Sequence, residues 1–196
     1  SGDFGAETVI STSAVGARSL YAADLDGDGD IDVLSASESD HKIAWYKNDG
    51  NGGFGPQIVI STSANYAVSV YAADLDSDGD LDVLSASYGD NKIAWYKNDG
   101  SGDFGPQTVI STAMNWAISV HSADLDGDGD MDVMATSYTD DKVAWYENDG
   151  SGGFGPPIII STTVNGAISV YAADLDGDGD MDVLSAAYSD GSIAWY

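Results

Sequence analysis

Residues 24–32 read Asp24-Leu25-Asp26-Gly27-Asp28-Gly29-Asp30-Ile31-Asp32, and this acidic stretch returns at residues 74–82, 124–132 and 174–182. An aspartate stands at every second position, with small residues between them where the chain must turn. Carboxylates this close repel one another strongly unless a cation lies among them. Oxygen ligands at the first, third and fifth positions of a short loop, with glycine at the turn, suit calcium. We therefore expect one calcium ion per stretch, four in the chain.

The spacing assigns a role to each aspartate of a stretch. The first, third and fifth offer side-chain oxygens, the seventh its backbone carbonyl, and the ninth a closing carboxylate. An EF-hand differs, because its closing glutamate stands at position twelve between helices. The alternatives are a solvated acidic turn without an ion, or magnesium, which dehydrates reluctantly. The predicted metal residues are Asp24, Asp26, Asp28, Asp30, Asp32, Asp74, Asp76, Asp78, Asp80, Asp82, Asp124, Asp126, Asp128, Asp130, Asp132, Asp174, Asp176, Asp178, Asp180 and Asp182.

The whole chain repeats with a period of 50 residues. Phe4-Gly5 returns at 54, 104 and 154, and Ala44-Trp45-Tyr46 returns at 94, 144 and 194. The repeats are approximately residues 1–50, 51–100, 101–150 and 151–196, within one domain that spans residues 1–196. One supersecondary unit is therefore used four times.

Each unit predicts four short strands and no helix. In the second unit these are residues 67–73, 81–87 and 92–97, and a shorter one at 104–111 behind Pro106. Strand three, Ile93-Ala94-Trp95-Tyr96, needs cover on both faces. Radial stacking of four-stranded blades supplies that cover, which predicts an all-β propeller. A β-solenoid is the alternative, but its coils are usually shorter.

The two ends of the chain predict how the propeller closes. Phe4 to Ser11 is a fourth strand without its first three, and the chain ends at Tyr196 after three strands. Joining the N-terminal strand to the last blade completes that blade and covers a sheet edge. Closure within one chain makes a four-bladed ring, and closure between two chains makes an eight-bladed homodimer. The sequence leaves both open, with a slight preference for the dimer.

The order of elements in each unit resembles the FG-GAP/VCBS repeat, the integrin-type propeller blade. That order is a strand, then Asp-Leu-Asp-Gly-Asp-Gly-Asp-x-Asp, a second strand and a Phe-Gly. The resemblance covers essentially all 196 residues. It implies a calcium-binding loop between the innermost strand and the next. The integrin Gly-Ala-Pro element is missing, since Ser-Ala-Ser or a variant follows strand two, so the bacterial VCBS branch is closer. The resemblance also implies an extracellular or cell-surface protein.

The charge excludes some partners. The formal net charge is −27, with 6 basic residues against 33 acidic ones. Nucleic acid and anionic membrane surfaces need lysine and arginine, so both are disfavoured. No apolar run approaches the roughly 20 residues of a membrane helix, so we expect no membrane insertion. There is no cysteine, which rules out disulfides and thiolate metal sites. No signal peptide is visible and the chain does not start with Met, so we expect a piece of a longer protein.

Positions that vary between repeats indicate where a ligand could bind. They lie in the turns on the face opposite the acidic loops. The candidate ligand residues are Asn65, Tyr66, Asn115, Trp116 and Asn165. Tolerated drift in exposed loops is the simpler interpretation. The tryptophans in register, Trp45 and its three copies, predict packing between blades, with a sugar platform as the alternative.

Catalysis has little support in the sequence. His41 and His121 are the only histidines and occupy non-equivalent positions, and no Ser-His-Asp set is visible. We therefore expect no enzyme, but an extracellular adhesion or recognition module or a scaffold, with a glycan or protein partner. A lectin-like carbohydrate-binding propeller and a calcium-dependent polysaccharide-active enzyme are the alternatives.

Overall fold

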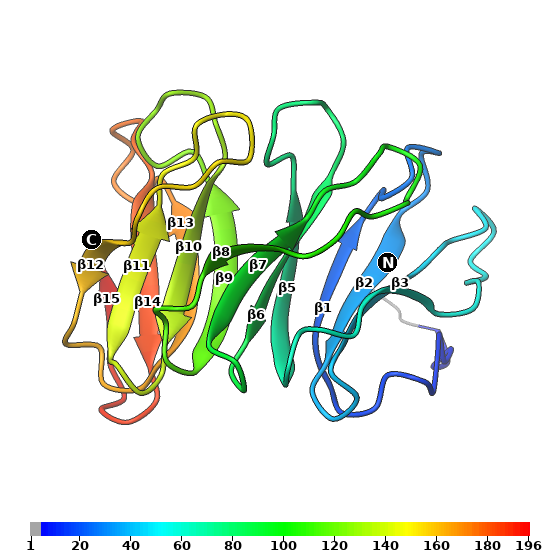
Figure 1. Cartoon of the computed structure of the whole chain (residues 1–196), viewed down its shortest axis with the longest axis horizontal. Coiled ribbons are helices and arrows are strands. Elements are labelled where there is room, and N and C mark those ends of the chain that lie inside the picture. The colour runs from blue at the N-terminus through cyan, green and yellow to red at the C-terminus, as the bar shows by residue number, and fades with distance from the viewer. Residues whose placement is uncertain (1–4) are drawn as a thin grey trace.

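A computed structural model describes residues 5–196 and contains only strands, in four antiparallel sheets. The first three sheets have four strands each, in chain order, and the last has three (Figure 1). The strands are β1 (Ala17–Ala23), β2 (Asp32–Ser37), β3 (Lys42–Tyr46), β4 (Ile58–Ser61), β5 (Ala67–Ala73), β6 (Asp82–Ser87), β7 (Lys92–Tyr96), β8 (Thr108–Ser111), β9 (Ala117–Ala123), β10 (Asp132–Ser137), β11 (Lys142–Tyr146), β12 (Ile158–Ser161), β13 (Ala167–Ala173), β14 (Asp182–Ala187) and β15 (Ile193–Trp195).

Composition explains why these segments form sheets that are covered on both faces. The central strand β6 is buried at every residue, and its neighbour β7 is buried at every residue except Lys92. Leu84 of β6 stands between Tyr71 of β5 and Trp95 of β7 in the register of the sheet. Aromatic and branched side chains on both faces favour strands that pack on two sides.

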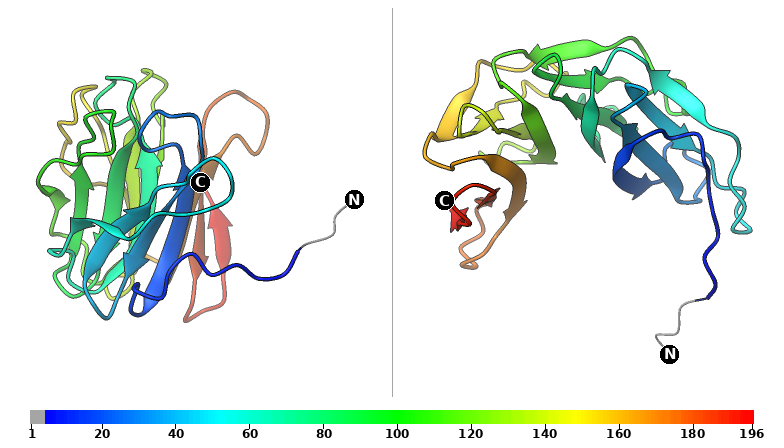
Figure 2. Two further views of the ribbon diagram at one scale, coloured as in Figure 1. Left: turned by 90° about the vertical axis from the view of Figure 1, so that its right-hand side faces the viewer. Right: turned by 90° about the horizontal axis from the view of Figure 1, so that it is seen from below.

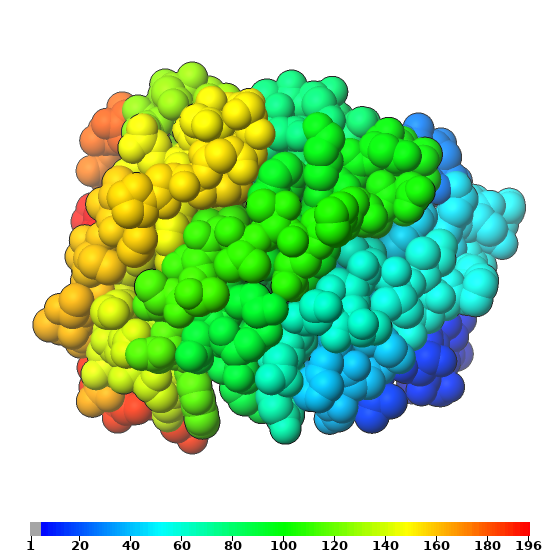
Figure 3. Space-filling model, in the orientation of Figure 1, coloured from blue at the N-terminus to red at the C-terminus, as the bar shows by residue number. Residues whose placement is uncertain are grey.

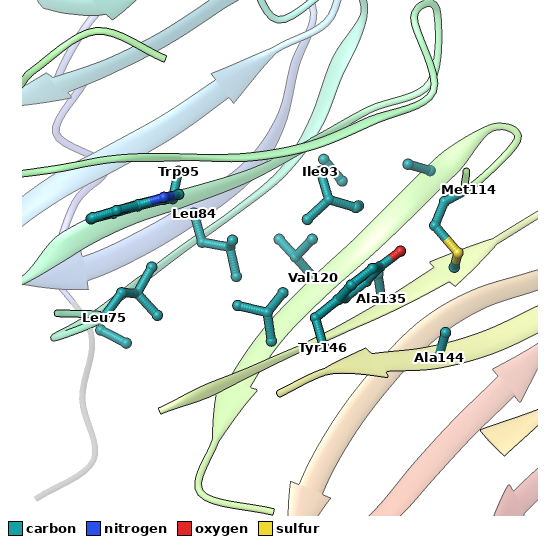
Figure 4. Close-up of a cluster of buried hydrophobic side chains, with 13 residues drawn as sticks. Leu75, Leu84, Ile93, Trp95, Met114, Val120, Ala135, Ala144 and Tyr146 are labelled. Carbon is teal, nitrogen blue, oxygen red and sulfur yellow. The ribbon is translucent and has the colours of Figure 1, made fainter. Parts of the chain in front are cut away.

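The four sheets stack side by side into an open arc (Figure 2). Space-filling atoms of each sheet lie directly against those of the next (Figure 3). Between the second and third sheets, Leu84 and Ile93 face Tyr146 and Met114 in one apolar cluster (Figure 4). Residues of β1, β5, β9 and β13 together line one shallow cavity, so the first strands of all sheets share the inner side of the arc.

The topology separates two sets of loops. The acidic loops between first and second strands share an edge with the turns between third and fourth strands, at the top of Figure 1. The turns between second and third strands lie at the opposite edge, with the connections from one sheet to the next. This arrangement confirms the predicted all-β propeller architecture of stacked blades. The fourth strands are shorter than predicted: β8 begins at Thr108, behind Pro106, and Phe104 forms only an isolated bridge with Asn98.

The N-terminus differs from the sequence prediction. Phe4 lies outside the described residues, and residues 5–16 form no strand. The last sheet therefore has three strands, β13, β14 and β15, and is not completed by the chain's own N-terminal segment. The physical reason is that the first and last sheets lie at opposite ends of the arc (Figure 2). The single chain is thus not the closed four-bladed ring that the sequence allowed.

We predict that Leu84→Ala lowers the free energy of unfolding by about 3–5 kcal/mol, because it leaves a cavity between two sheets. Leu84 is 0% exposed. Val109→Ala is the control, since Val109 is 47% exposed on the outer strand β8; it should change stability by less than about 1 kcal/mol. Urea unfolding of both variants measures the difference. Equal losses would contradict the assignment of the core.

Candidate metal centres and an aromatic face

Each repeat brings three carboxylates together at its acidic loop. In each group, one oxygen from every residue lies within 4.8 Å of the others. The first, third and fourth repeats use the first, third and ninth aspartates of the stretch, whereas the second repeat uses the first, third and fifth. The groups are Asp24, Asp26 and Asp32; Asp74, Asp76 and Asp78; Asp124, Asp126 and Asp132; and Asp174, Asp176 and Asp182.

Backbone amides hold the first loop in shape. Gly29 N donates to Asp24 Oδ2 at 2.9 Å, and Asp30 N donates to Asp28 Oδ1 at 3.0 Å. Gly27 has φ +70° and Gly29 has φ +92°, which side chains other than glycine rarely adopt. The glycines therefore allow the tight turn that aims the first carboxylates at a common point.

The ninth aspartate also joins the loop to the turn beyond it. Asp82 Oδ2 accepts a hydrogen bond from Leu75 N at 3.0 Å, and Asp82 Oδ1 accepts one from Asn98 N at 2.8 Å. Burial raises the pKa of Asp82 to about 7, against the lowering effect of these two bonds. The ninth carboxylate therefore holds the backbone in place at the start of the second strand, and in three repeats it also belongs to the carboxylate group.

The donor set fits a hard cation. Asp24 Oδ1, Asp26 Oδ1 and Asp76 Oδ1 are buried and accept no hydrogen bond in the part of the chain that the structure describes. A buried carboxylate oxygen without a partner is costly, and a bound cation removes that cost. Only oxygen atoms converge, which favours calcium or magnesium over softer metals.

The seventh aspartates do not join the groups. A Cβ built on Gly50 would lie 2.4 Å from Asp30 Oδ2, and one on Gly100 would lie 2.4 Å from Asp80 Oδ2. These side chains therefore lie against the turn after the third strand. The predicted use of their backbone carbonyls stays a prediction. The predicted residues outside the groups are thus Asp28, Asp30, Asp80, Asp82, Asp128, Asp130, Asp178 and Asp180.

The residue after the third strand is a lysine in the first two repeats, and it approaches the carboxylates of the acidic loop. Lys47 Nζ pairs with Asp26 and lies 2.9 Å from Asp28 Oδ2. Lys97 makes the same pairs with the third and fifth aspartates of the second loop. The third repeat has Glu147 at this position, so the loops differ in charge.

Exposed and half-buried aromatic side chains gather at the opposite edge of the arc. We name His41, Tyr66, Tyr88, Trp116, Tyr138 and Tyr188 the aromatic row. Consecutive ring centroids from His41 to Tyr188 are 4.8, 5.0, 5.4, 5.8 and 6.4 Å apart. Part of the row lines a cavity of about 340 Å³, together with Arg18, Ile118 and Ile168. The row thus runs across all four sheets.

Two members of the row adopt an unfavourable backbone conformation. Tyr66 and Trp116 both have φ +54°, in the left-handed region. The equivalent residues of the other two repeats are Gly16 and Gly166. A bulky residue in this region costs roughly 1–2 kcal/mol, yet Tyr66 is 41% exposed and Trp116 is 48% exposed. The structure therefore bears strain to present these rings to solvent.

The candidate ligand residues lie on this face, in different settings. Tyr66, Asn115, Trp116 and Asn165 are exposed, and Asn65 is half-buried. Asn115 Nδ2 already donates to Asp140 Oδ1 at 2.8 Å. The structure brings Tyr66 and Trp116 into one row but leaves the asparagines apart from the cavity lining.

Sequence reasoning left six cavity residues off the candidate list: Arg18, Tyr88, Ile118, Tyr138, Ile168 and Tyr188. Tyr88, Tyr138 and Tyr188 share one position in three repeats, a signal that could have found them. Arg18 Nε pairs with Glu38 Oε2 at 2.9 Å, and Tyr88 Oη donates to Glu38 Oε1 at 2.5 Å. That hydrogen bond raises the pKa of Tyr88 to about 12. Arg18 has no copy in other repeats, so only the structure could find it.

The interior tryptophans have the predicted packing role. Trp45 and Trp95 are buried and lie edge-on to Phe104 and Phe154 of the following sheets, with ring centroids 6.4 and 6.5 Å apart. Their rings are therefore closed to a sugar.

A model of the FG-GAP-like repeat matches residues 24–85, 74–135 and 124–185. The chain belongs to the FG-GAP-like repeat family. A search among curated proteins found no match. The described residues contain no helix, and so none long and apolar enough to cross a membrane.

Several solved structures share the fold. An Agrocybe aegerita lectin specific for non-reducing terminal N-acetylglucosamine is 22% identical, with a TM-score of 0.62 over 89% of this chain and 50% of its own. The V. cholerae biofilm matrix protein Bap1 is 23% identical, with a TM-score of 0.57 over 90% of this chain and 26% of its own. An auxiliary nutrient binding protein of Bacteroides ovatus is 13% identical, with a TM-score of 0.57 over 94% and 48%. This chain spans half or less of each of them.

We predict that Trp116→Gly changes the free energy of unfolding by less than about 1 kcal/mol. The loss of stacking on Tyr88 and Tyr138, about 0.5–1.5 kcal/mol per pair, is offset by relief of the left-handed backbone. Chemical denaturation measures the change. A loss above about 3 kcal/mol would show that the ring is part of the core instead.

Proposed function

We propose that this chain is a calcium-stabilised, non-catalytic recognition module that binds a glycan through the aromatic row. The observation that carries the proposal is the strained, exposed placement of Tyr66 and Trp116. Strained backbone conformations cluster at ligand contacts and other functional sites.

The chemistry of the row suits a sugar. Flat aromatic faces bury the apolar face of a pyranose ring, and nearby polar groups bond its hydroxyls. Arg18 and Glu38 supply such groups beside the rings. The net charge of −27 becomes −27 + 8 = −19 with four calcium ions, which favours neutral glycans over acidic ones. The fold shared with a lectin is consistent with this proposal.

The histidines support a role without catalysis. His121 is packed between Tyr71 and Tyr171, with ring centroids 4.5 Å away on each side, and burial lowers its pKa. His41 Nδ1 accepts a hydrogen bond from Tyr66 N at 2.9 Å. His121 is thus held between two aromatic rings, and Nδ1 of His41 already accepts a backbone hydrogen bond.

The expected ion and location go together. Extracellular calcium modules often bind at about 10⁻⁴–10⁻³ M, where extracellular calcium fills them. We propose that the four acidic loops bind calcium and that the protein is extracellular or at a cell surface. The biofilm matrix protein among the similar structures is consistent with this location.

Glycan binding is tested with an array of neutral and acidic glycans, followed by titration of the best neutral hit. We expect Tyr66→Gly and Trp116→Gly each to weaken binding at least tenfold, because an aromatic contact is lost. Val109→Ala, on the outer strand, is the matched control and should bind like the parent. An array without hits, or unchanged binding by Trp116→Gly, would overturn the glycan proposal and favour a scaffold.

Calcium binding is tested by thermal unfolding in calcium, magnesium and a chelator. We expect calcium at 100 times its dissociation constant to add about 2.7 kcal/mol per filled site, so the unfolding temperature should fall sharply in chelator. An unchanged unfolding curve in chelator, with no metal retained by elemental analysis, would contradict the proposal.

Because Lys47 and Lys97 pair with the carboxylates of the first two acidic loops, we predict that the four loops differ in calcium affinity. Lys47→Ala and Lys97→Ala should each raise the calcium affinity of their own loops, because a competing cation is removed. Lys142→Ala is the control, since Lys142 Nζ lies 3.3 Å from Asp140 Oδ2 on the opposite face. Calorimetric titration with calcium measures the change. Lower affinity in Lys97→Ala would show that the lysine supports the loop instead.

A further inference from the structure

The two ends of the arc expose the surfaces that are buried between its sheets. Leu20 on the first sheet is 66% exposed, whereas its copy Val70 is 4% exposed. Ile193 on the last sheet is 81% exposed, whereas its copy Ile93 is 0% exposed. Trp195 is likewise 54% exposed. We call the exposed side of the first sheet the leading face and that of the last sheet the trailing face.

These faces are complementary, because every internal interface pairs one of each kind. Between the first two sheets, Leu25, Ile43 and Trp45 pack against Val70 and Val83. The equivalent residues at the open ends are Leu175, Ile193 and Trp195 on the trailing face, and Leu20 and Val33 on the leading face. Each exposed face thus has the partner surface at the other end of the chain.

Polar contacts repeat in the same way at the internal interfaces. Val120 N donates to Ser69 Oγ at 3.2 Å, and Val170 N donates to Ser119 Oγ at 3.4 Å. The same rule would pair Leu20 N with Ser169 Oγ. These bonds set the register between sheets, so the end faces carry specific complementarity as well as apolar area.

The last sheet lacks a fourth strand, and the N-terminal segment has the sequence of one. Residues 8–11 read Thr8-Val9-Ile10-Ser11, the same as β8, Thr108–Ser111. In the second sheet, Ala94 pairs with Val109 and Trp95 with Thr108. The same register would pair Ala194 with Val9 along the open edge of β15.

We propose that two copies of this chain join head to tail into one ring of eight sheets. Residues 8–11 of each copy become the fourth strand of its partner's last sheet. One chain cannot pair its own end faces, because they lie at opposite ends of the arc (Figure 2). A second copy related by a twofold axis along the ring axis pairs both ends at once and leaves no open face. This proposal does not depend on the ligand of the aromatic row.

The first test is the mass in solution with calcium present. We expect twice the chain mass of 20.3 kDa by light scattering, with no larger species. Ile193→Asp should give a monomer with unchanged circular dichroism, since a charge would be buried at the interface. Val109→Asp, on the outer strand, is the control and should stay dimeric. A monomeric parent chain, as expected if further repeats of a longer protein cover the ends, or an open polymer would overturn the proposal.

The second test traps the new strand pair. The chain has no cysteine, so Val9→Cys with Ala194→Cys introduces one pair at facing positions of adjacent strands, which a disulfide can bridge. We expect a covalent dimer on a non-reducing gel, and none for either single variant. A disulfide within one chain would instead show a four-sheet ring and overturn the proposal. Absence of cross-linking under oxidising conditions would also overturn it.

Discussion

The burial of both faces of every sheet is the constraint on which the rest of this structure depends. Each sheet has a bulky third strand, such as β7, and a fully buried second strand, such as β6, so it needs a neighbour on either side. Side-by-side stacking satisfies that demand, and the small residues of the first strands let the sheets converge at the inner side of the arc. The curvature of the arc follows from this closer approach of the sheets at their first strands. At the ends the same demand is left unmet, so Leu20 at one end and Ile193 at the other are exposed.

The acidic loops serve this packing. They connect the first and second strands, and their ninth carboxylate holds backbone amides from two other segments, as Asp82 does with Leu75 and Asn98. Asn98 Nδ2 in turn donates to Leu25 O of the preceding sheet at 2.7 Å, so each loop is tied to its neighbour. A cation that neutralises the remaining carboxylates would stabilise one whole edge of the arc. The proposed metal centres would therefore be architectural, and the repetition of the acidic loops in every unit has the same origin as the repetition of the sheets.

The opposite edge is where the units differ. There the turns carry ion pairs such as Arg18–Glu38, and the repeats exchange glycine for tyrosine or tryptophan at one left-handed position. The rigid sheets hold these side chains in line, so that rings from separate repeats stack into a continuous row. The aromatic row and the acidic loops lie at opposite edges because the antiparallel connection sends alternate loops to opposite edges.

The sequence by itself determined the repeat, the all-β class and the strands, because the period of 50 residues and the apolar patterns are local properties. It also located the four acidic loops, since these need only a local turn, but the structure groups three of the five predicted aspartates in each loop. Only the tertiary structure decided how the units assemble: it shows an open arc, with an N-terminal segment that the last sheet cannot reach, because closure depends on an angle accumulated over all four sheets. It alone showed the left-handed φ of Tyr66 and Trp116 and brought Arg18 beside Tyr188, more than 150 residues away in the chain. Contacts between distant repeats depend on how sheets pack, and no local pattern encodes them.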